Sequence, residues 1–256
     1  MRTRANGRIV FWEGASLWTL DAPPDERYPK TDPHAHHVIQ ITLALRGRVH
    51  FDCAGDHVEG VAIAIAPDVP HAFEATGLTA HLFVASDGAP GRAILRTCLS
   101  GASIAHIPAE LLGDLPERLR TTFDSPVRSD EALRSVGREL VQRLAGEGIG
   151  PRFTDVRIAK LMGWVTARLD EATTLSDVAE HIGLSPGRVR HLFVQHIGLP
   201  FRTYLLWLRL NRAVELYAGG ESLTEAAHGQ GFADSAHLSR TFRRMFGIVA
   251  ATLRVS

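Results

Sequence analysis

Histidines crowd the N-terminal half of this 256-residue chain, where eight of the thirteen lie before residue 110. Three of them stand together in HAHH at 34–37, and another follows a proline-bounded turn in APDVPHAF. Residues two apart on a strand point to the same face, so His34, His36 and Gln40 would share one face. Imidazole nitrogens bind zinc, nickel and iron, and three of them with an amide oxygen would leave coordination positions open. The pattern predicts a divalent-metal site (Zn, Ni or Fe) made of His34, His36, Gln40 and His71.

A second chemistry-bearing segment is TLSDVAEHIGLSPGRVRHLFVQHIG at 174–198. Its first part predicts a short helix in which the small Ala179 faces inward, and Gly183 permits a sharp turn after it. Serine followed by proline, as at Ser185 and Pro186, is typical of a helix start. The segment therefore predicts two short helices joined by a tight turn, which is the helix-turn-helix arrangement.

The second of these helices has two unlike faces. Its packed stripe consists of Val189, Leu192, Phe193, His196 and Ile197. Its outer face consists of Gly187, Arg188, Arg190, His191 and Gln195. Arginine contacts guanine through two hydrogen bonds, and histidine or glutamine can contact base edges or phosphates. The outer face is therefore a candidate DNA-binding surface, with a merely solvated basic face as the alternative.

The same plan recurs in ESLTEAAHGQGFADSAHLSRTFRRMFG at 221–247. Gly231 would form the turn and Asp234 would cap the second helix. The residues expected inside are Leu223, Ala226, Ala227, Leu238, Phe242 and Phe246. The outer face would present Ser235, Ala236, His237, Arg240, Arg243 and Arg244. A single copy does not separate a DNA-binding face from a solvated one, and the second copy favours DNA.

The segment between the two copies, FRTYLLWLRLNRAVELYAG at 201–219, predicts one continuous helix of about five turns. Such a rod would fix the orientation of the two helix-turn-helix units. Two units on one rod can address successive major-groove faces of a duplex.

The rest of the chain must position the histidines. Short apolar runs broken by Gly, Pro and Asp follow one another from about residue 9 to residue 84, and they predict antiparallel strands in a sandwich or barrel. Apolar residues at helical spacing predict two amphipathic helices over 108–147, and GEGIGP at 146–151 has linker composition. We therefore divide the chain into a strand domain at 1–107, a helical segment at 108–150 and a helix-turn-helix domain at 151–256.

Composition limits the function classes. No apolar run is long enough to span a membrane and the start lacks a secretion signal, so a cytoplasmic protein is expected. Two cysteines, Cys53 and Cys98, are too few for a disulfide framework or a thiolate zinc site. Residues 1–154 carry 16 Lys/Arg against 19 Asp/Glu, and residues 155–256 carry 12 against 9. The C-terminal part is thus the more basic one, the sign expected for a nucleic-acid partner.

The C-terminal hundred residues resemble the AraC/XylS family of bacterial transcription regulators. The matching elements are A-x-x-x-G-L-S at 179–185, WLRLNRA at 207–213 and GFADSAHLSRTFRRMFG at 231–247. The resemblance implies that Arg243 and Arg244 contact phosphates. It implies that the base-facing positions are Gly187, Arg190, His191, Ser235, Ala236, His237 and Arg240.

The N-terminal histidine pattern resembles the two cupin motifs, with Gln40 where a cupin metal site usually has glutamate. The fold class implied is an all-β cupin-like barrel or jelly roll followed by helices, then an all-α double helix-turn-helix domain. Because glutamine brings no charge to a cation, a sensor barrel without metal is the alternative to a metal site.

These features together predict a ligand- or metal-responsive regulator, and not an enzyme, that binds double-stranded promoter DNA. An unidentified small-molecule effector would enter the barrel. A homodimer is expected if the apolar stripe of the helical segment, Leu133, Val136, Leu140 and Leu144, packs against a second copy, and packing on its own barrel is the alternative. A cupin-type metal-dependent enzyme with a helical assembly domain is the competing hypothesis for the whole chain.

Overall fold

The computed structural model describes residues 5–12, 14–22, 30–53, 55–146, 156–169, 171, 173–197, 200–250 and 253–255. Most of the predicted linker at 146–151 lies outside these residues. The contacts divide the chain into two compact units. The first comprises Met1–Ser86, Pro90–Ile149 and Phe242–Ser256, and the second comprises Asp87–Ala89 and Gly150–Thr241.

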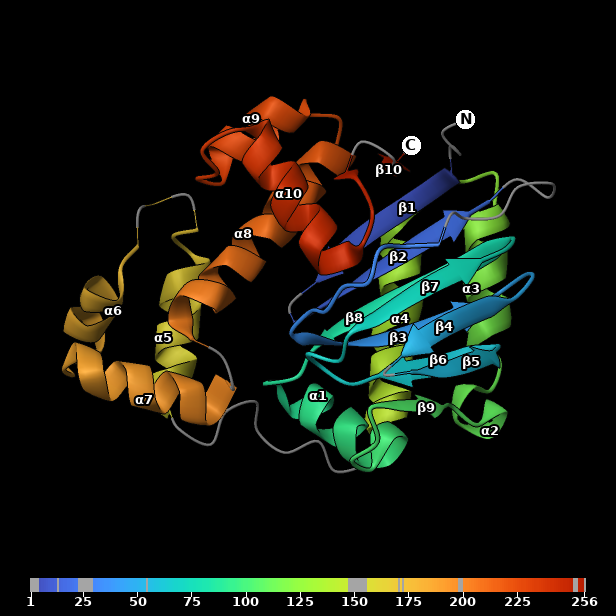
Figure 1. The fold of residues 1–256 in the computed structure, drawn as a ribbon, viewed down its shortest axis with the longest axis horizontal. Coiled ribbons are helices and arrows are strands. Elements are labelled where there is room, and N and C mark those ends of the chain that lie inside the picture. Colours follow the sequence, from blue (N-terminus) through green and yellow to red (C-terminus); the bar gives the residue numbers. More distant parts are fainter. Residues whose placement is uncertain are drawn as a thin grey trace. The chain divides into compact units, whose positions relative to one another are not determined.

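Two β-sheets form the body of the first unit (Figure 1). The larger has the order β10-β1-β2-β8-β3-β6-β9, and the smaller has the order β5-β4-β7. Alternating apolar residues bring the sheets together, because Phe51, Ile65 and Phe73 are buried in one cluster. The strands are β1 (Ala5–Trp12), β2 (Ala15–Asp21), β3 (Val38–Ala44), β4 (Val49–Cys53), β5 (Asp56–Gly60), β6 (Ala62–Ile65), β7 (His71–Ala75), β8 (Leu78–Ala85), β9 (Ile104–His106) and β10 (Leu253–Val255).

Helices cover the larger sheet on the face away from the smaller one (Figure 1). These elements are α1 (Ala89–Ile94), the π-helix η1 (Leu95–Leu99), α2 (Ala109–Leu112), α3 (Leu115–Asp124) and α4 (Asp130–Ala145). The apolar stripe of α4, Leu133, Val136, Leu140 and Leu144, is buried in the same core as residues of β1, β2, β3 and β8. Of the two predicted uses of this stripe, the structure shows packing on the chain's own sheet.

Six helices make up the C-terminal part of the described chain. They are α5 (Val156–Thr166), α6 (Leu175–Ile182), α7 (Pro186–Ile197), α8 (Phe201–Ala218), α9 (Leu223–Gly229) and α10 (Ser235–Phe246). The continuous helix predicted over 201–219 is confirmed by α8. The all-α second part and the strand-rich first part confirm the predicted fold class.

Two of the short helices begin with the same capping device. Thr174 accepts a hydrogen bond from the backbone of Asp177 while the Asp177 carboxylate accepts one from Thr174, and Ser222 and Glu225 repeat the exchange at α9. Each exchange satisfies backbone donors that a helix start otherwise leaves without partners. Short helices depend on such caps, because few internal hydrogen bonds offset the cost of nucleation.

Removing one cap should cost measurable stability. We expect Thr174→Ala to lower the free energy of unfolding by about 1 kcal/mol, since the hydroxyl that accepts from Asp177 is lost. Urea unfolding followed by circular dichroism measures the change. Thr174→Ser keeps the hydroxyl and is the matched control, so equal losses in the two variants would show that the cap contributes nothing.

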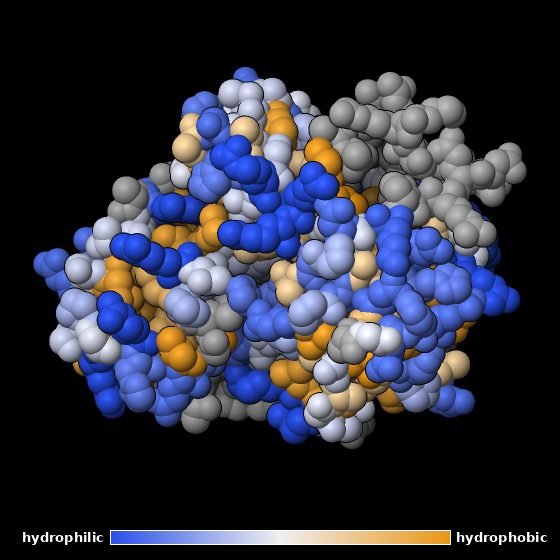
Figure 2. Space-filling view, viewed as in Figure 1, coloured by the Kyte–Doolittle hydropathy of each residue, from blue (hydrophilic) through white to orange (hydrophobic). Residues whose placement is uncertain are grey.

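Hydrophilic side chains cover most of the visible surface of the molecule, with smaller apolar areas between them (Figure 2). Among the described residues, no helix combines the length and the apolar character needed to cross a bilayer.

Candidate DNA-binding helices and histidine centre

The pair α6 and α7 has the predicted helix-turn-helix construction. Gly183 adopts a left-handed conformation with φ 69°, which glycine tolerates best, and the Leu184 amide donates to the Ala179 carbonyl at 2.9 Å. The Ser185 hydroxyl accepts from the backbone of Arg188 at 3.3 Å, so α7 is capped where the sequence predicts. Ala179 and Phe193 are fully buried in one cluster, which holds the two helices together.

The outer face of α7 is exposed as predicted. All five residues predicted for it are exposed, namely Gly187, Arg188, Arg190, His191 and Gln195. Val194, which was not predicted to lie on this face, is 44% exposed. It lies seven residues after Gly187 and three after His191, so it shares their face of the helix. This face therefore carries arginine, histidine and glutamine side chains with one apolar residue among them.

The pair α9 and α10 repeats the construction. Gly231 is left-handed with φ 71°, the Phe232 amide donates to the Ala227 carbonyl at 3.0 Å, and Asp234 accepts from the backbone of His237 at 2.5 Å. The predicted turn and cap are thus confirmed. Of the six residues expected inside, Ala226, Ala227, Leu238, Phe242 and Phe246 are buried, while Leu223 is only half-buried.

The outer face of α10 is less uniform than that of α7. Ala236, Arg240, Arg243 and Arg244 are exposed, whereas Ser235 and His237 are half-buried. His237 accepts from the Ala233 amide through Nδ1 at 3.4 Å, and its ring contacts Phe232. One of its nitrogens therefore supports the turn, and its Nε2 is left for an external contact.

Arg243 has a partner within the chain. Its Nε donates to the Asp32 carboxylate at 2.5 Å, and both residues belong to the first unit. The hydrogen bond to Asp32 raises the pKa of this guanidinium. A phosphate would have to compete with that carboxylate for Arg243, whereas Arg240 and Arg244 are simply exposed.

Arg209, in the WLRLNRA stretch, anchors α8. Its guanidinium donates to the carbonyls of Leu169 and Glu171 at 3.1 and 2.6 Å, just before the cap of α6. Tyr204 and Leu205 of the same helix belong to the apolar cluster of α6 and α7. The linker helix is thus fastened to the first helix-turn-helix unit by both packing and hydrogen bonds.

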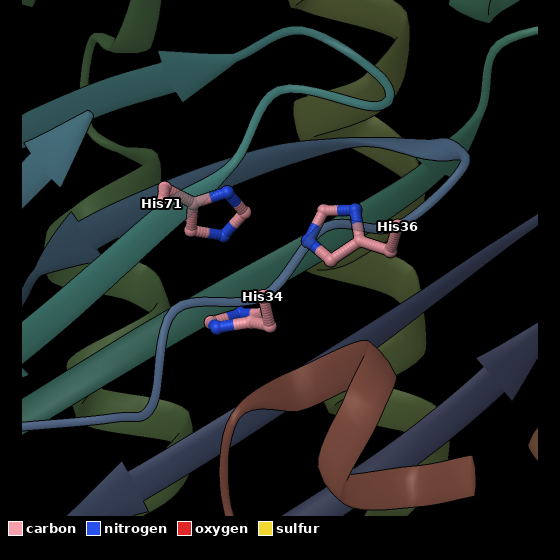
Figure 3. Close-up of side chains that lie close together, drawn as sticks. All are labelled: His34, His36 and His71. Atoms are coloured by element: carbon pink, nitrogen blue, oxygen red, sulfur yellow. The ribbon is translucent and has the colours of Figure 1, made fainter. Parts of the chain in front are cut away.

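In the first unit, His34, His36 and His71 gather at one buried point (Figure 3). Their ligand atoms all lie within 4.8 Å of one another, and each residue is at most 5% exposed. One expectation was wrong, because His34 and His36 do not alternate along a strand. They precede β3, and His34 instead forms an isolated bridge with His71 through two backbone hydrogen bonds of 2.9 Å.

Backbone carbonyls fix the tautomer of all three rings. Nδ1 of His34 lies 2.8 Å from the Asp32 carbonyl, Nδ1 of His36 lies 3.0 Å from that of Val38, and Nδ1 of His71 lies 2.8 Å from that of Val69. A carbonyl oxygen only accepts, so each Nδ1 carries the ring proton and each Nε2 keeps its lone pair. This orienting hydrogen bond is the one that metal-binding histidines usually make.

Burial keeps these rings neutral. Loss of solvent lowers the pKa of His34 to about 4 and that of His71 to about 2, and it also lowers the pKa of His36. The positive charge of one ring would further oppose protonation of its neighbours. At neutral pH all three histidines are therefore in the form that binds metal.

Gln40 completes the histidine centre, by which we mean His34, His36, Gln40 and His71. Its Oε1 lies 2.8 Å from Nε2 of His36 and 3.1 Å from Nε2 of His71. Neither nitrogen carries a proton, so acceptor atoms face one another in a buried space. A cation would satisfy all of them, and the residues present thus fit a divalent metal.

Two residues that continue from Gln40, Thr42 and His81, were missed from the sequence. The Gln40 amide donates to Thr42 at 3.0 Å, and Thr42 contacts Nδ1 of His81 at 3.0 Å. Thr42 and His81 are cross-strand partners on β3 and β8. The alternation of Gln40 and Thr42 on one strand was the only signal in the sequence, and it does not reveal which residue of β8 lies opposite.

Comparison with known proteins bears on the C-terminal part. A sequence profile described as a helix-turn-helix domain matches residues 178–255. The transcriptional activator RhaS of Salmonella schwarzengrund strain CVM19633 is 32% identical over 145 residues, which is 56% of this chain and 52% of that protein. RhaS of Escherichia fergusonii is 37% identical over 99 residues, 38% of this chain and 36% of that protein.

The C-terminal domain is an AraC-family helix-turn-helix domain. The resemblance stated from the sequence is thereby confirmed. The chain spans about half the length of the curated relatives it matches. ToxT from Vibrio cholerae O395 has a similar fold, with a TM-score of 0.57, 12% identity and coverage of 96% of this chain and 100% of that one. This likeness supports the two-domain architecture of a strand-rich domain followed by AraC-type helices.

Proposed function

We propose that this protein is a ligand- or metal-responsive regulator that binds promoter DNA sequence-specifically. The observation that carries the proposal is the pair of helix-turn-helix units on one helix, α8, each with arginine on an exposed face. The named RhaS relatives are transcriptional activators, which supports regulation over catalysis. The competing metal-dependent enzyme would share the histidine centre but would leave the exposed faces of α7 and α10 without a role.

The exposed side chains suit distinct contacts with double-stranded DNA. Arg190 on α7 and Arg240 on α10 would contact guanine edges, while Arg244 would contact a phosphate. Val194 would meet a thymine methyl group, the apolar feature of the major groove. Gly187 offers no side chain, so the first helix-turn-helix unit would depend for base preference on its neighbours Arg188, Arg190, His191 and Gln195. In the second helix-turn-helix unit, the residues beside the bases would be Ser235, Ala236 and His237.

Fluorescence anisotropy with the DNA upstream of the protein's own gene tests this proposal. We expect tighter binding to that DNA than to random duplex of equal length, with affinity falling as salt rises because phosphate contacts release counterions. Equal affinity for the two duplexes at every salt concentration would contradict sequence-specific binding.

The proposal also includes that the protein is a homodimer and that it acts in the cytoplasm, where promoter DNA is found. Because the α4 stripe is occupied in its own unit, the dimer contact would lie elsewhere.

We further propose that the histidine centre holds a divalent metal such as zinc, nickel or iron. His34, His36 and His71 would bind it through Nε2, and Gln40 through Oε1. A metal held by these neutral ligands keeps its charge and open positions, and it would supply an electrophilic point for an oxygen-bearing effector. ToxT, the structural neighbour, has also been solved with an unsaturated fatty acid bound, which supports a small-molecule effector for this fold.

Loss of one ligand should abolish tight metal binding. We expect the wild-type chain, equilibrated with Zn²⁺ and passed through a desalting column, to retain one zinc by elemental analysis. His36→Ala should weaken zinc binding by more than about 100-fold, since it removes a coordinating nitrogen and its fixed geometry. His50→Ala, which removes an exposed histidine of β4, is the matched control. Equal zinc content in the two variants would rule out this centre.

A further inference from the structure

The Gln40 amide continues into a buried chain of hydrogen bonds that the metal proposal does not use. Beyond Thr42 and His81, Nε2 of His81 lies 3.1 Å from the Thr79 hydroxyl, and that hydroxyl lies 3.3 Å from the Leu20 carbonyl. The four side chains in this series of hydrogen bonds are each at most 2% exposed, and they are Gln40, Thr42, His81 and Thr79. Burial lowers the pKa of His81 to about 3, so its ring carries a single proton at neutral pH.

The carbonyl at the far end determines the direction of every proton. The Leu20 oxygen only accepts, so the Thr79 hydroxyl donates to it and accepts from Nε2 of His81. Nδ1 of His81 is then an acceptor for the Thr42 hydroxyl, and Thr42 accepts from the Gln40 amide nitrogen. This order leaves Oε1 of Gln40 aimed at His36 and His71.

In this orientation the centre needs a cation, because Oε1 of Gln40 faces Nε2 of His36 and Nε2 of His71. Neither Nε2 carries a proton, since the proton of each ring is on Nδ1. Turning the Gln40 amide over removes the need. Its NH₂ group would donate to Nε2 of His36 and of His71, and Thr42 would donate to Oε1. His81 would donate to Thr42 from Nδ1 and accept from Thr79 at Nε2. Only the 3.3 Å hydrogen bond to Leu20 is lost.

We propose that Gln40, Thr42 and His81 form a two-state switch whose hydrogen-bond direction reports whether the histidine centre holds metal. The inference rests on the proposed metal function. With metal, Oε1 points inward and the His81 proton is on Nε2. Without metal, the amide nitrogen points inward and the proton is on Nδ1. The ring exchanges one proton position for the other, so its charge and the number of protons do not change.

The switch gives glutamine a function at this position. A glutamate has no N–H to donate, so it could not satisfy the two imidazole nitrogens when the centre is empty. Gln40 thus stabilises the empty state, which lowers metal affinity and makes loading reversible. Thr42 and His81 are positioning residues in this account, since they act on the centre through Gln40.

The tautomer of His81 is the direct readout. Side-chain nitrogen NMR of the full chain labelled with ¹⁵N-histidine distinguishes the protonated from the unprotonated ring nitrogen. We expect the His81 proton on Nε2 with one equivalent of Zn²⁺ and on Nδ1 after the metal is removed with a chelator. The same tautomer in both samples, with zinc bound in the first, would overturn the switch and leave the metal site standing. If the resonances of His34, His36 and His71 ignore zinc, both proposals fail.

Two variants separate the switch from a merely structural role. In Gln40→Glu, Thr42 can only donate to the carboxylate, so the His81 proton should stay on Nδ1 with and without zinc. Zinc should also bind at least about tenfold more tightly in this variant, in competition with a chromophoric chelator. In Thr42→Val the path is cut, and the His81 tautomer should no longer respond to zinc although the metal still binds. A zinc-dependent tautomer in either variant would contradict the proposal.

Discussion

Replacing Arg240 with alanine is expected to weaken binding to the preferred DNA site by about 1 to 3 kcal/mol, or about 5- to 150-fold. Arg240 is exposed near the middle of α10, on the same helical face as Ala236 and Arg244. A guanidinium in that position can donate two hydrogen bonds to one guanine, and alanine leaves both acceptors without a partner. Binding to the preferred site should weaken by this amount, and binding to random duplex should weaken much less.

Competition between specific and random DNA at fixed salt separates base contact from general charge. Arg120→Ala is the matched control, since it removes one positive charge from α3 in the first unit, where Arg120 pairs with Glu117. We expect that control to bind the specific site as the wild type does. Equal weakening on specific and random DNA in Arg240→Ala would show that Arg240 contacts only phosphate.

Acid should unfold the metal-free first unit far above the pH at which carboxylates titrate. The pKa is lowered from the usual 6.5 to about 4 in His34, to about 2 in His71 and to about 3 in His81, and burial is the main cause in each. Burial also lowers the pKa of His36. The folded protein thus holds neutral histidines that the unfolded chain would protonate.

Proton linkage gives the direction in which stability changes with pH. Between pH 6.5 and about 4 the unfolded state binds more protons, so stability is full above pH 6.5 and falls as the pH falls. For each pH unit of acidification, each buried histidine lowers the free energy of unfolding by up to about 1.4 kcal/mol. The loss from four such histidines can exceed the whole stability of a typical domain. Carboxylates with lowered pKa, such as Asp52, lose their stabilising effect only below their usual range near 3.8.

Urea unfolding of chelator-treated protein from pH 8 to pH 4.5, followed by tryptophan fluorescence, measures this loss. His71→Leu should flatten the profile, because one buried titrating group is removed, even if its stability at pH 8 is lower. His106→Ala, which removes an exposed ring at the end of β9, should leave the profile unchanged. Constant stability from pH 7 to pH 5 would show that these histidines are already protonated or are not buried.

The helix-turn-helix domain could be predicted almost completely because its signals are local. Caps such as Ser185 and Asp234, turns such as Gly183 and Gly231, and the helical spacing of buried residues each act within a few positions. The exposed face of α7 follows from the same spacing. What local signals do not show is that His237 uses one nitrogen for its own turn and that Arg243 has the partner Asp32.

The histidine centre was found by residue type more than by geometry. The structure brings together the four residues that the sequence named, although His34 and His36 do not lie on a strand. His81 was missed because its role depends on the register of β8 against β3, which pairs it with Thr42. The α4 stripe could not be assigned from sequence either, because burial against the chain's own sheet and burial against a second copy require the same apolar residues.

Selection from a random duplex library tests the central claim, sequence-specific DNA binding by two helix-turn-helix units, most directly. The purified full chain should enrich sites that contain two short conserved blocks whose centres lie about 10 base pairs apart, one for each reading helix. A variant carrying Arg190→Ala and Arg240→Ala should lose both blocks. A wild-type library that stays random after repeated rounds, at salt concentrations where the protein still binds DNA, would contradict the account.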